Sequence, residues 1–208
     1  MVPQNSPREP LGRDKIVDHT LTLIEEHGIA GFRLKDLASR LQVTIPNLYR
    51  HFKNRDDIVY SALTDDYIAM CSATTQRIDE MTTRVTATSD LVSALRHDDA
   101  SSPTPAHRRR TTRLHALAAF EGHERSEEIR AALHKQHVAM ENFFRRAQEV
   151  GLVDSHYSPV VLTLVASSML TGVAVTEVDP YLQSAEDDLW GLIHTFLESL
   201  RPNGRSVE

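Results

Sequence analysis

The chain has 208 residues, of which 40% are hydrophobic and 25% charged. These proportions are ordinary for a globular protein and exclude a disordered or collagen-like chain. A chain of this length can bury a core without disulfides or a structural metal. Its single cysteine, Cys71, leaves no internal disulfide, which favours a reducing, cytoplasmic setting. Residues 1–10 contain no apolar run, so we expect a disordered lead-in and no signal peptide.

The charge is unevenly distributed along the chain, although the net value is −6. From Arg33 to Arg55 there are six Lys or Arg and one Asp, a local net charge of +5. From Val59 onward 14 basic residues stand against 21 acidic ones, a net charge of −7. The first segment suits phosphates and the second does not, so we expect the two parts to meet different partners.

Hydrophobic spacing predicts helices through almost the whole chain after Pro10. Val17, Leu21 and Ile24 recur at helical intervals, and Gly28 follows where that helix is expected to end. No segment alternates as a strand does, so we predict an all-α fold of about nine helices. The other predicted helices are Leu34 to Leu41, Thr44 to Phe52, Asn54 to Met70, Asp90 to Arg96, Arg109 to Phe120, Ser126 to Gly151, Val160 to Val175 and Leu189 to Leu200.

The helices at Leu34 to Leu41 and Thr44 to Phe52, with two residues between them, have the layout of a helix-turn-helix. A plain helical hairpin has the same spacing. No acidic residue lies between Asp36 and Lys53, whereas a solvated helix face normally mixes Glu with Lys. This composition favours DNA binding over a plain hairpin.

The segments Phe32-Arg-Leu-Lys-Asp-Leu-Ala38 and Val43-Thr-Ile-Pro-Asn-Leu-Tyr-Arg-His-Phe-Lys-Asn-Arg-Asp-Asp-Ile58 resemble the DNA-binding region of the TetR family of transcriptional regulators. The Leu-Tyr-Arg-His-Phe core, followed by a basic residue and two acids, is the most specific part. The close resemblance covers about a quarter of the chain, and the rest matches in layout only. It implies a helix-turn-helix domain at residues 11–57 and a helical regulatory and dimerisation domain at residues 58–202.

The resemblance implies contacts with double-stranded operator DNA. Ile45 and Asn47 would face the major groove, where Asn can bond adenine bidentately and Ile can pack on a thymine methyl. The other residues would contact mainly phosphates, which set register and affinity but carry little sequence information. The full expected DNA-binding set is Arg33, Lys35, Thr44, Ile45, Pro46, Asn47, Tyr49, Arg50, His51, Lys53 and Arg55.

The sequence departs from the family pattern at three positions. Gln42 occupies the turn position that is usually Gly, so either it adopts a positive φ, at a cost on the order of 1 kcal/mol, or the turn differs. Arg33 stands where a Thr usually caps the second helix, so the cap is lost and a phosphate contact is gained. Arg55 replaces a usual Lys and keeps its charge.

The family resemblance also implies a mostly apolar small-molecule ligand bound by the C-terminal domain, which acts by changing the spacing of the DNA-binding heads in a homodimer. For any one candidate the alternative is an ordinary core residue. The eleven histidines include His134 and His137 on one predicted face with His123 nearby, but no recognisable ligand set for a metal, and we expect neither metal nor cofactor. The candidate ligand-binding residues are Tyr67, Met70, His115, Phe120, His137, Met140, Phe143 and Met169.

The last two predicted helices resemble a dimerisation face. The uncharged run from Tyr157 to Thr176 is about long enough to span a bilayer, but its Ser and Thr residues favour a buried helix. The expected dimer residues are Val160, Ala166, Leu170, Val173, Leu189, Trp190, Ile193, Phe196, Leu197 and Leu200. We therefore expect a repressor released from its operator by a small molecule. The alternatives are an all-α enzyme, disfavoured by the lack of a catalytic motif, and a DNA-binding protein without a ligand.

Overall fold

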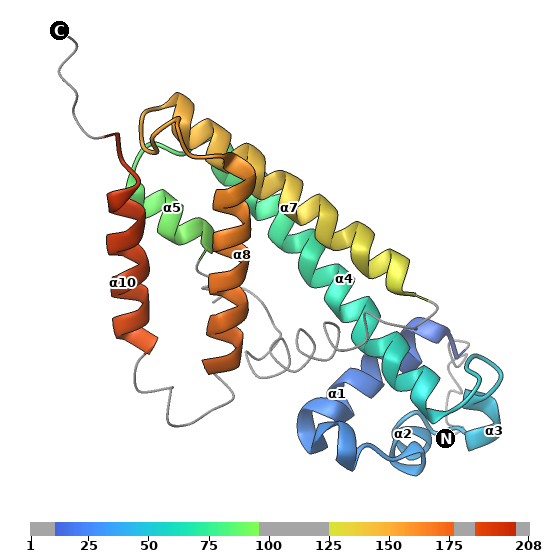
Figure 1. Cartoon of the computed structure of the whole chain (residues 1–208). Helices are drawn as coiled ribbons and strands as arrows, with labels where there is room; N and C mark the ends of the chain where they lie inside the picture. The colour runs from blue at the N-terminus through green and yellow to red at the C-terminus, as the bar shows by residue number, and fades with distance from the viewer. Residues whose placement is uncertain (1–10, 96–124, 177–185, 203–208) are drawn as a thin grey trace, which may run out of the picture. The chain divides into compact units, whose positions relative to one another are not determined.

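The computed structural model describes residues 11–95, 125–176 and 186–202, and this part of the chain contains eight α-helices and no strand (Figure 1). The predicted all-α fold is confirmed. Residues 1–10 and the helix predicted at Arg109 to Phe120 lie outside the described residues. The helices are α1 (Arg13–Gly31), α2 (Leu34–Arg40), α3 (Ile45–Leu48), α4 (Arg55–Thr82), α5 (Thr88–Leu95), α7 (Ser126–Glu149), α8 (Pro159–Thr176) and α10 (Glu186–Ser199).

The chain divides into two compact units, with the boundary between Asp66 and Tyr67 inside α4. The first unit has its own core, in which α1 packs on α2 and α2 on α3. Val17, Leu21 and Ile24 are buried in it, which confirms the predicted apolar stripe of α1, and Ile16 and Leu23 widen that stripe. Its buried residues are Ile16, Val17, Leu21, Leu23, Ile24, Phe32, Leu37, Ala38, Leu48, Phe52, Ile58, Val59, Ala62 and Leu63.

Gly28 interrupts α1 and does not end it. Its φ of +70° and ψ of 168° are non-helical, in a region that favours glycine because it has no Cβ. One more turn follows, through Gly31, because the Phe32 N–H still donates to the carbonyls of Gly28 at 3.1 Å and Ile29 at 3.3 Å. After this kink the chain places Phe32 in the core, immediately before α2 begins.

The second unit has a larger core, formed where α7 packs on α8 and α10 on α5. Phe143 and Phe144 lie at its centre, with ring centroids 6.0 Å apart in an edge-to-face arrangement. A smaller cluster joins α4 to α7 through Tyr67, Cys71 and Ile129, and Figure 1 shows these two long helices side by side. The main core includes Ile78, Leu91, Leu95, Met140, Phe143, Phe144, Leu162, Ala166, Trp190, Ile193, Leu197 and Leu200.

The connection between α7 and α8 follows its sequence signals. Gly151 ends α7 with a φ of +75°, while the Leu152 N–H donates to the Ala147 carbonyl at 2.9 Å, as in a glycine-terminated helix. Pro159 begins α8, where its missing N–H leaves no helical bond unmade. The Asp154 N–H donates to the Leu200 carbonyl at 2.7 Å, which ties this connection to the end of α10.

α4 and α5 extend beyond their predicted bounds. α4 continues beyond Met70 to Thr82 because Ile78 still has a core to pack against. α5 begins at Thr88, before the predicted Asp90. The Asp90 carboxylate accepts the backbone N–H groups of Thr86 and Ala87, each at 2.8 Å, so it caps a helix in which it also lies.

The Asp90 cap makes the stability of the second unit pH-dependent. The two backbone hydrogen bonds lower the pKa of Asp90 in the folded chain, so their contribution is present above the unfolded pKa of about 3.9 and is lost as pH falls through the folded value. We expect Asp90→Ala to lower the free energy of unfolding by about 1 kcal/mol at neutral pH. Denaturant titrations of both proteins at neutral and acid pH check this, since an equal gap at both would contradict a charged cap.

Candidate nucleic-acid interface

The turn between α2 and α3 closes through a left-handed residue. The Val43 N–H donates to the Ala38 carbonyl at 2.9 Å and the Gln42 N–H to the Ser39 carbonyl at 3.1 Å. Gln42 has a φ of +56°, in the region where an L residue is strained by roughly 1 kcal/mol. Of the two outcomes expected for the missing Gly, the chain has the first: it keeps the turn and accepts the strain.

The third helix is shorter than predicted, since it ends at Leu48 and not at Phe52. Residues 49–51 continue as turns, in which the His51 N–H donates to the Leu48 carbonyl at 3.0 Å. The reason lies in Phe52, which is only 4% exposed. The backbone must leave the helical path to bring this ring into the core and begin α4.

The buried and exposed sides of α3 are sharply separated. Leu48 is completely buried, and Ile45 is partly buried against the same core, which leaves only part of that side chain accessible to DNA. Tyr49 is 44% exposed. The residues on the exposed side are Thr44, Pro46, Asn47, Tyr49, Arg50 and His51.

Thr44 is the N-cap residue of α3, as its sequence position suggests, but its side chain does not make the capping hydrogen bond expected of a threonine there. Its hydroxyl instead donates to Asn47 Oδ1 at 3.2 Å, while the Asn47 N–H donates to the Thr44 carbonyl at 2.9 Å. Thr44 therefore orients the Asn47 amide. The carboxamide NH2 of Asn47 remains a donor on the exposed side of the helix.

Positive charge surrounds this exposed side. Arg33, directly before α2, makes no side-chain cap, as expected, and is exposed, as are Lys35 and Lys53. Lys53 lies in a connection fixed by reciprocal bonds, because the Lys53 N–H donates to Asp57 Oδ2 at 2.7 Å and the Asp57 N–H to Asn54 Oδ1 at 2.8 Å. The Asn54 side chain therefore caps the start of α4.

Arg40 and Arg55, both basic residues of this segment, are engaged within the unit. Arg40 forms a bidentate pair with Glu26, at 3.0 and 2.7 Å, and this hydrogen-bonded guanidinium lowers the pKa of Glu26. Arg55 donates to the carbonyls of Ile29 at 2.9 Å and Phe32 at 3.2 Å. The positive charge available to a phosphate is therefore smaller than the sequence count of +5.

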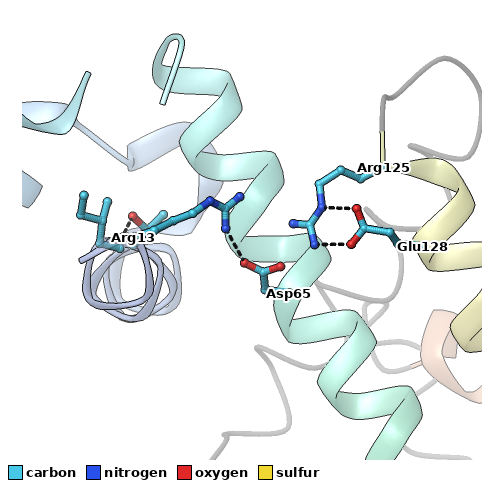
Figure 2. Close-up of polar contacts among 6 residues, drawn as sticks. Arg13, Asp65, Arg125 and Glu128 are labelled. Atoms are coloured by element: carbon cyan, nitrogen blue, oxygen red, sulfur yellow. Dashed lines mark hydrogen bonds and ion pairs between the residues drawn. The ribbon is translucent and has the colours of Figure 1, made fainter. Parts of the chain in front are cut away.

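Arg13, which sequence reasoning missed, supports Phe52, which follows α3. Its guanidinium lies 5.0 Å from the centroid of the Phe52 ring and pairs with Asp65 of α4 at 3.1 Å (Figure 2). No sequence signal identifies it, because the partners are 52 positions apart. The other pair labelled in Figure 2, Arg125 with Glu128, joins two residues at the start of α7 in the second unit.

The candidate ligand-binding residues fall into two clusters in the second unit. Tyr67 and Met70 belong to the small cluster between α4 and α7, whereas Met140, Phe143 and Met169 belong to or pack on the main core. His137 lies on α7, where local burial and the neighbouring His134 lower its pKa. His115 and Phe120 lie outside the described residues.

Many candidate dimer residues pack within their own chain. Ala166, Trp190, Ile193, Leu197 and Leu200 are buried in the main core, and Leu189 and Phe196 pack against it. Val160, in contrast, is 59% exposed. The side chains of Leu170 and Val173 are outside the described part of α8.

The same helices carry exposed apolar side chains that the sequence prediction did not include. These are Val161 and Leu164 of α8, 55% and 65% exposed, and Leu192 of α10, 66% exposed. Because sequence periodicity identifies apolar helix faces but not which face meets the chain's own core, it selected mainly the inward stripe of α10.

Within residues 11–95, 125–176 and 186–202, no three His, Cys, Asp or Glu side chains gather in a way that could hold a metal ion. Among the helices the structure describes, none combines the length and apolar character needed to cross a membrane.

Comparison with known families identifies the first unit. Residues 16–62 match the model of the bacterial regulatory proteins of the tetR family, which confirms the resemblance in the sequence: the first unit carries a TetR-type helix-turn-helix. No curated protein matches the chain.

Solved structures of about the same length share the fold. A protein from Saccharomonospora viridis assigned as a transcriptional regulator, in complex with choline, has a TM-score of 0.71 at 16% identity, covering 89% of this chain and 95% of that one. SmeT, the repressor of the Stenotrophomonas maltophilia efflux pump SmeDEF, has a TM-score of 0.63 at 21% identity, covering 94% and 93%. Its triclosan complex has a TM-score of 0.61 at 22% identity, covering 92% of each chain. The fold is therefore that of TetR-family transcriptional regulators.

The strained turn before α3 gives a stability prediction. Gln42→Gly removes a side chain from a positive-φ position, so we expect it to raise the free energy of unfolding by up to about 1 kcal/mol. Ser39→Gly, an exposed helical position next to the turn, serves as the control and should lower stability. Denaturant unfolding of the three proteins measures both changes, and a destabilised Gln42→Gly would refute strain at this turn.

Proposed function

We propose that the chain is a sequence-specific transcriptional regulator that binds double-stranded operator DNA through α3 and is most simply a repressor. The observation that carries this proposal is the composition of the exposed side of α3. Asn47, Tyr49, Arg50 and His51 lie there above a fully buried Leu48. A helix held in this way can enter the major groove with its outer side chains toward the bases and phosphates.

The roles divide by chemistry. Asn47 can bond base edges, and the accessible part of Ile45 can pack on a thymine methyl. Arg33, Lys35, Arg50 and Lys53 supply positive charge to phosphates, and the Tyr49 hydroxyl supplies a hydrogen bond. Thr44 acts through Asn47, whose carbonyl oxygen accepts its hydroxyl at 3.2 Å. Pro46 and His51 complete the surface.

A small molecule that binds the second unit is proposed to release the operator. The fold neighbours solved with choline and with triclosan support a ligand-responsive reading, although their low identity carries no ligand to this chain. The apolar cluster around Tyr67, with Met70 and Cys71, favours a mostly apolar compound, and His137 is a candidate polar contact. Such a ligand acts by binding one arrangement of the heads better than another.

We also propose that the chain acts as a homodimer. Val160, Val161 and Leu164 on α8 and Leu192 on α10 are at least 55% exposed, and such apolar residues on two helices of one core fit a second copy better than water. Gly191 lies beside Leu192, and the position that a Cβ would take there has no atom packed against it within 4 Å. The space next to Leu192 is therefore open. A two-fold pair places two recognition helices on half-sites about 34–36 Å apart.

The alternatives make different predictions for DNA. An all-α enzyme would bind no preferred sequence, and the matched family and the fold neighbours are regulators. A ligand-independent DNA-binding protein would select a sequence but would not be released by any compound. Selection of bound duplexes from a random pool, followed by a compound screen for release, separates all three.

The recognition surface is tested by Asn47→Ala and Tyr49→Phe. Loss of the Asn47 amide should lower the preference for the selected duplex over a scrambled one by about 1–3 kcal/mol. Tyr49→Phe should weaken binding to both duplexes alike, because it removes only a phosphate contact. Mobility shifts with both duplexes, together with circular dichroism to verify folding, measure the two effects. Undiminished selectivity in Asn47→Ala would reject this assignment of α3.

The proposed dimer face is tested by placing charge on it. We expect Leu164→Glu with Leu192→Glu to shift the chain from dimer to monomer and to weaken binding to a two-half-site duplex more than to a single half-site. Val138→Glu on α7, where the valine is 42% exposed, is the matched control and should remain dimeric. Sedimentation equilibrium reports the mass, and a dimeric double variant would place the interface elsewhere.

A further inference from the structure

Arg55 makes four contacts that all fall within the first unit. Its Nη2 atom donates to the carbonyls of Ile29 at 2.9 Å and Phe32 at 3.2 Å. Its Nη1 atom pairs with Asp56 at 3.0 Å, and its guanidinium carbon lies 5.5 Å from the centroid of the Phe32 ring. One side chain from the start of α4 therefore holds the backbone between α1 and α2.

The held backbone is a helix end that lacks a cation of its own. The last turn of α1 contains no basic residue, although the carbonyls at a helix C-terminus carry partial negative charge. It also follows the kink at Gly28, so its direction is not fixed by the main body of α1. The Arg55 guanidinium supplies both the missing charge and two directed hydrogen bonds.

We infer that Arg55 is a positioning residue for the DNA-binding surface and not one of its phosphate contacts. The residue after Phe32 is Arg33, the N-cap residue of α2, and both Arg33 and Lys35 are exposed. By fixing the Ile29 and Phe32 carbonyls, Arg55 fixes where Arg33 enters the surface. The inference deepens the proposed function and rests on it.

Lysine and arginine differ at this position in a way that separates the two roles. A lysine keeps the charge and can contact a phosphate, but it lacks the planar guanidinium that lies over the Phe32 ring while it donates to two carbonyls. If Arg55 positions the turn, Arg55→Lys is a damaging change. If Arg55 contacts a phosphate, Arg55→Lys is close to neutral.

The experiment uses the full chain and the duplex recovered from a random pool by the unaltered protein. Affinity is measured against salt for the wild type, Arg55→Lys, Arg33→Ala and the double variant. Arg40→Lys, which changes the arginine paired with Glu26, is the control for an Arg-to-Lys exchange in the same unit. Thermal unfolding establishes that each protein is folded at the assay temperature.

We expect Arg55→Lys to weaken binding roughly tenfold and to leave the salt slope unchanged. The loss should shrink when Arg33 is already Ala, because the residue being positioned is gone. A merely structural loss of folded protein would weaken both backgrounds equally and would overturn the inference. So would wild-type affinity in Arg55→Lys.

A second variant keeps the test decisive if Arg55→Lys does not fold. Arg55→Gln removes the charge and retains an amide donor. An unchanged salt slope in Arg55→Gln supports positioning, whereas a slope smaller by about 0.9, the value of one phosphate contact, overturns it.

Failure of the proposed function gives a different result. If the wild type selects no sequence, the regulator proposal fails. Amide hydrogen exchange then tests, without DNA, whether Arg55 holds the backbone between α1 and α2. The Phe32 N–H, which donates to the carbonyls of Gly28 and Ile29, should exchange faster in Arg55→Lys than in the wild type. Equal exchange rates would show that Arg55 does not hold this backbone and would overturn the inference.

Discussion

The four-residue helix α3 is too short to be stable or to hold a direction by itself. Leu48, completely buried, anchors it from within, and Phe52, 4% exposed, anchors the chain just after it. Every proposed DNA contact from Asn47 to His51 depends on these two side chains keeping their place. The surrounding features of the first unit are understood most simply as supports for them.

The supports are polar contacts at the edges of an apolar core. Arg13 lies over Phe52 and Arg55 over Phe32, and each guanidinium also pairs with a carboxylate or a carbonyl of another segment. Arginine suits both uses because its planar group stacks on a ring while its edges donate hydrogen bonds. The basic composition of this unit therefore serves architecture as well as DNA attraction.

The sequence predicted the helical class, the α1 stripe and the family of the first unit, because hydrophobic spacing and the Leu-Tyr-Arg-His-Phe motif are local signals. It did not predict the end of α3, which is decided by Phe52 turning into a core made by distant helices. It also did not indicate that Arg55 bonds Ile29 and Phe32, since the partners are more than twenty positions away. Contacts between distant segments require the folded chain.

The same limit explains the second unit. Periodicity identified an apolar stripe on α10, and the structure places it in or against the chain's own core. The stripe consists of Leu189, Ile193, Phe196 and Leu200, broadened by Trp190 and Leu197. Leu192, which the prediction left out, is 66% exposed, although Leu189 and Phe196, three and four positions away, pack against that core. Composition along one helix cannot distinguish an intramolecular face from an intermolecular one.

Cys71 has a practical consequence for experiments on this protein. It is the chain's single cysteine and only 1% exposed, in the small cluster with Tyr67 and Ile129. A thiol reagent reaches it only when α4 and α7 separate locally. The alkylation rate therefore reports local opening at this one place, and a compound that binds there would slow the reaction.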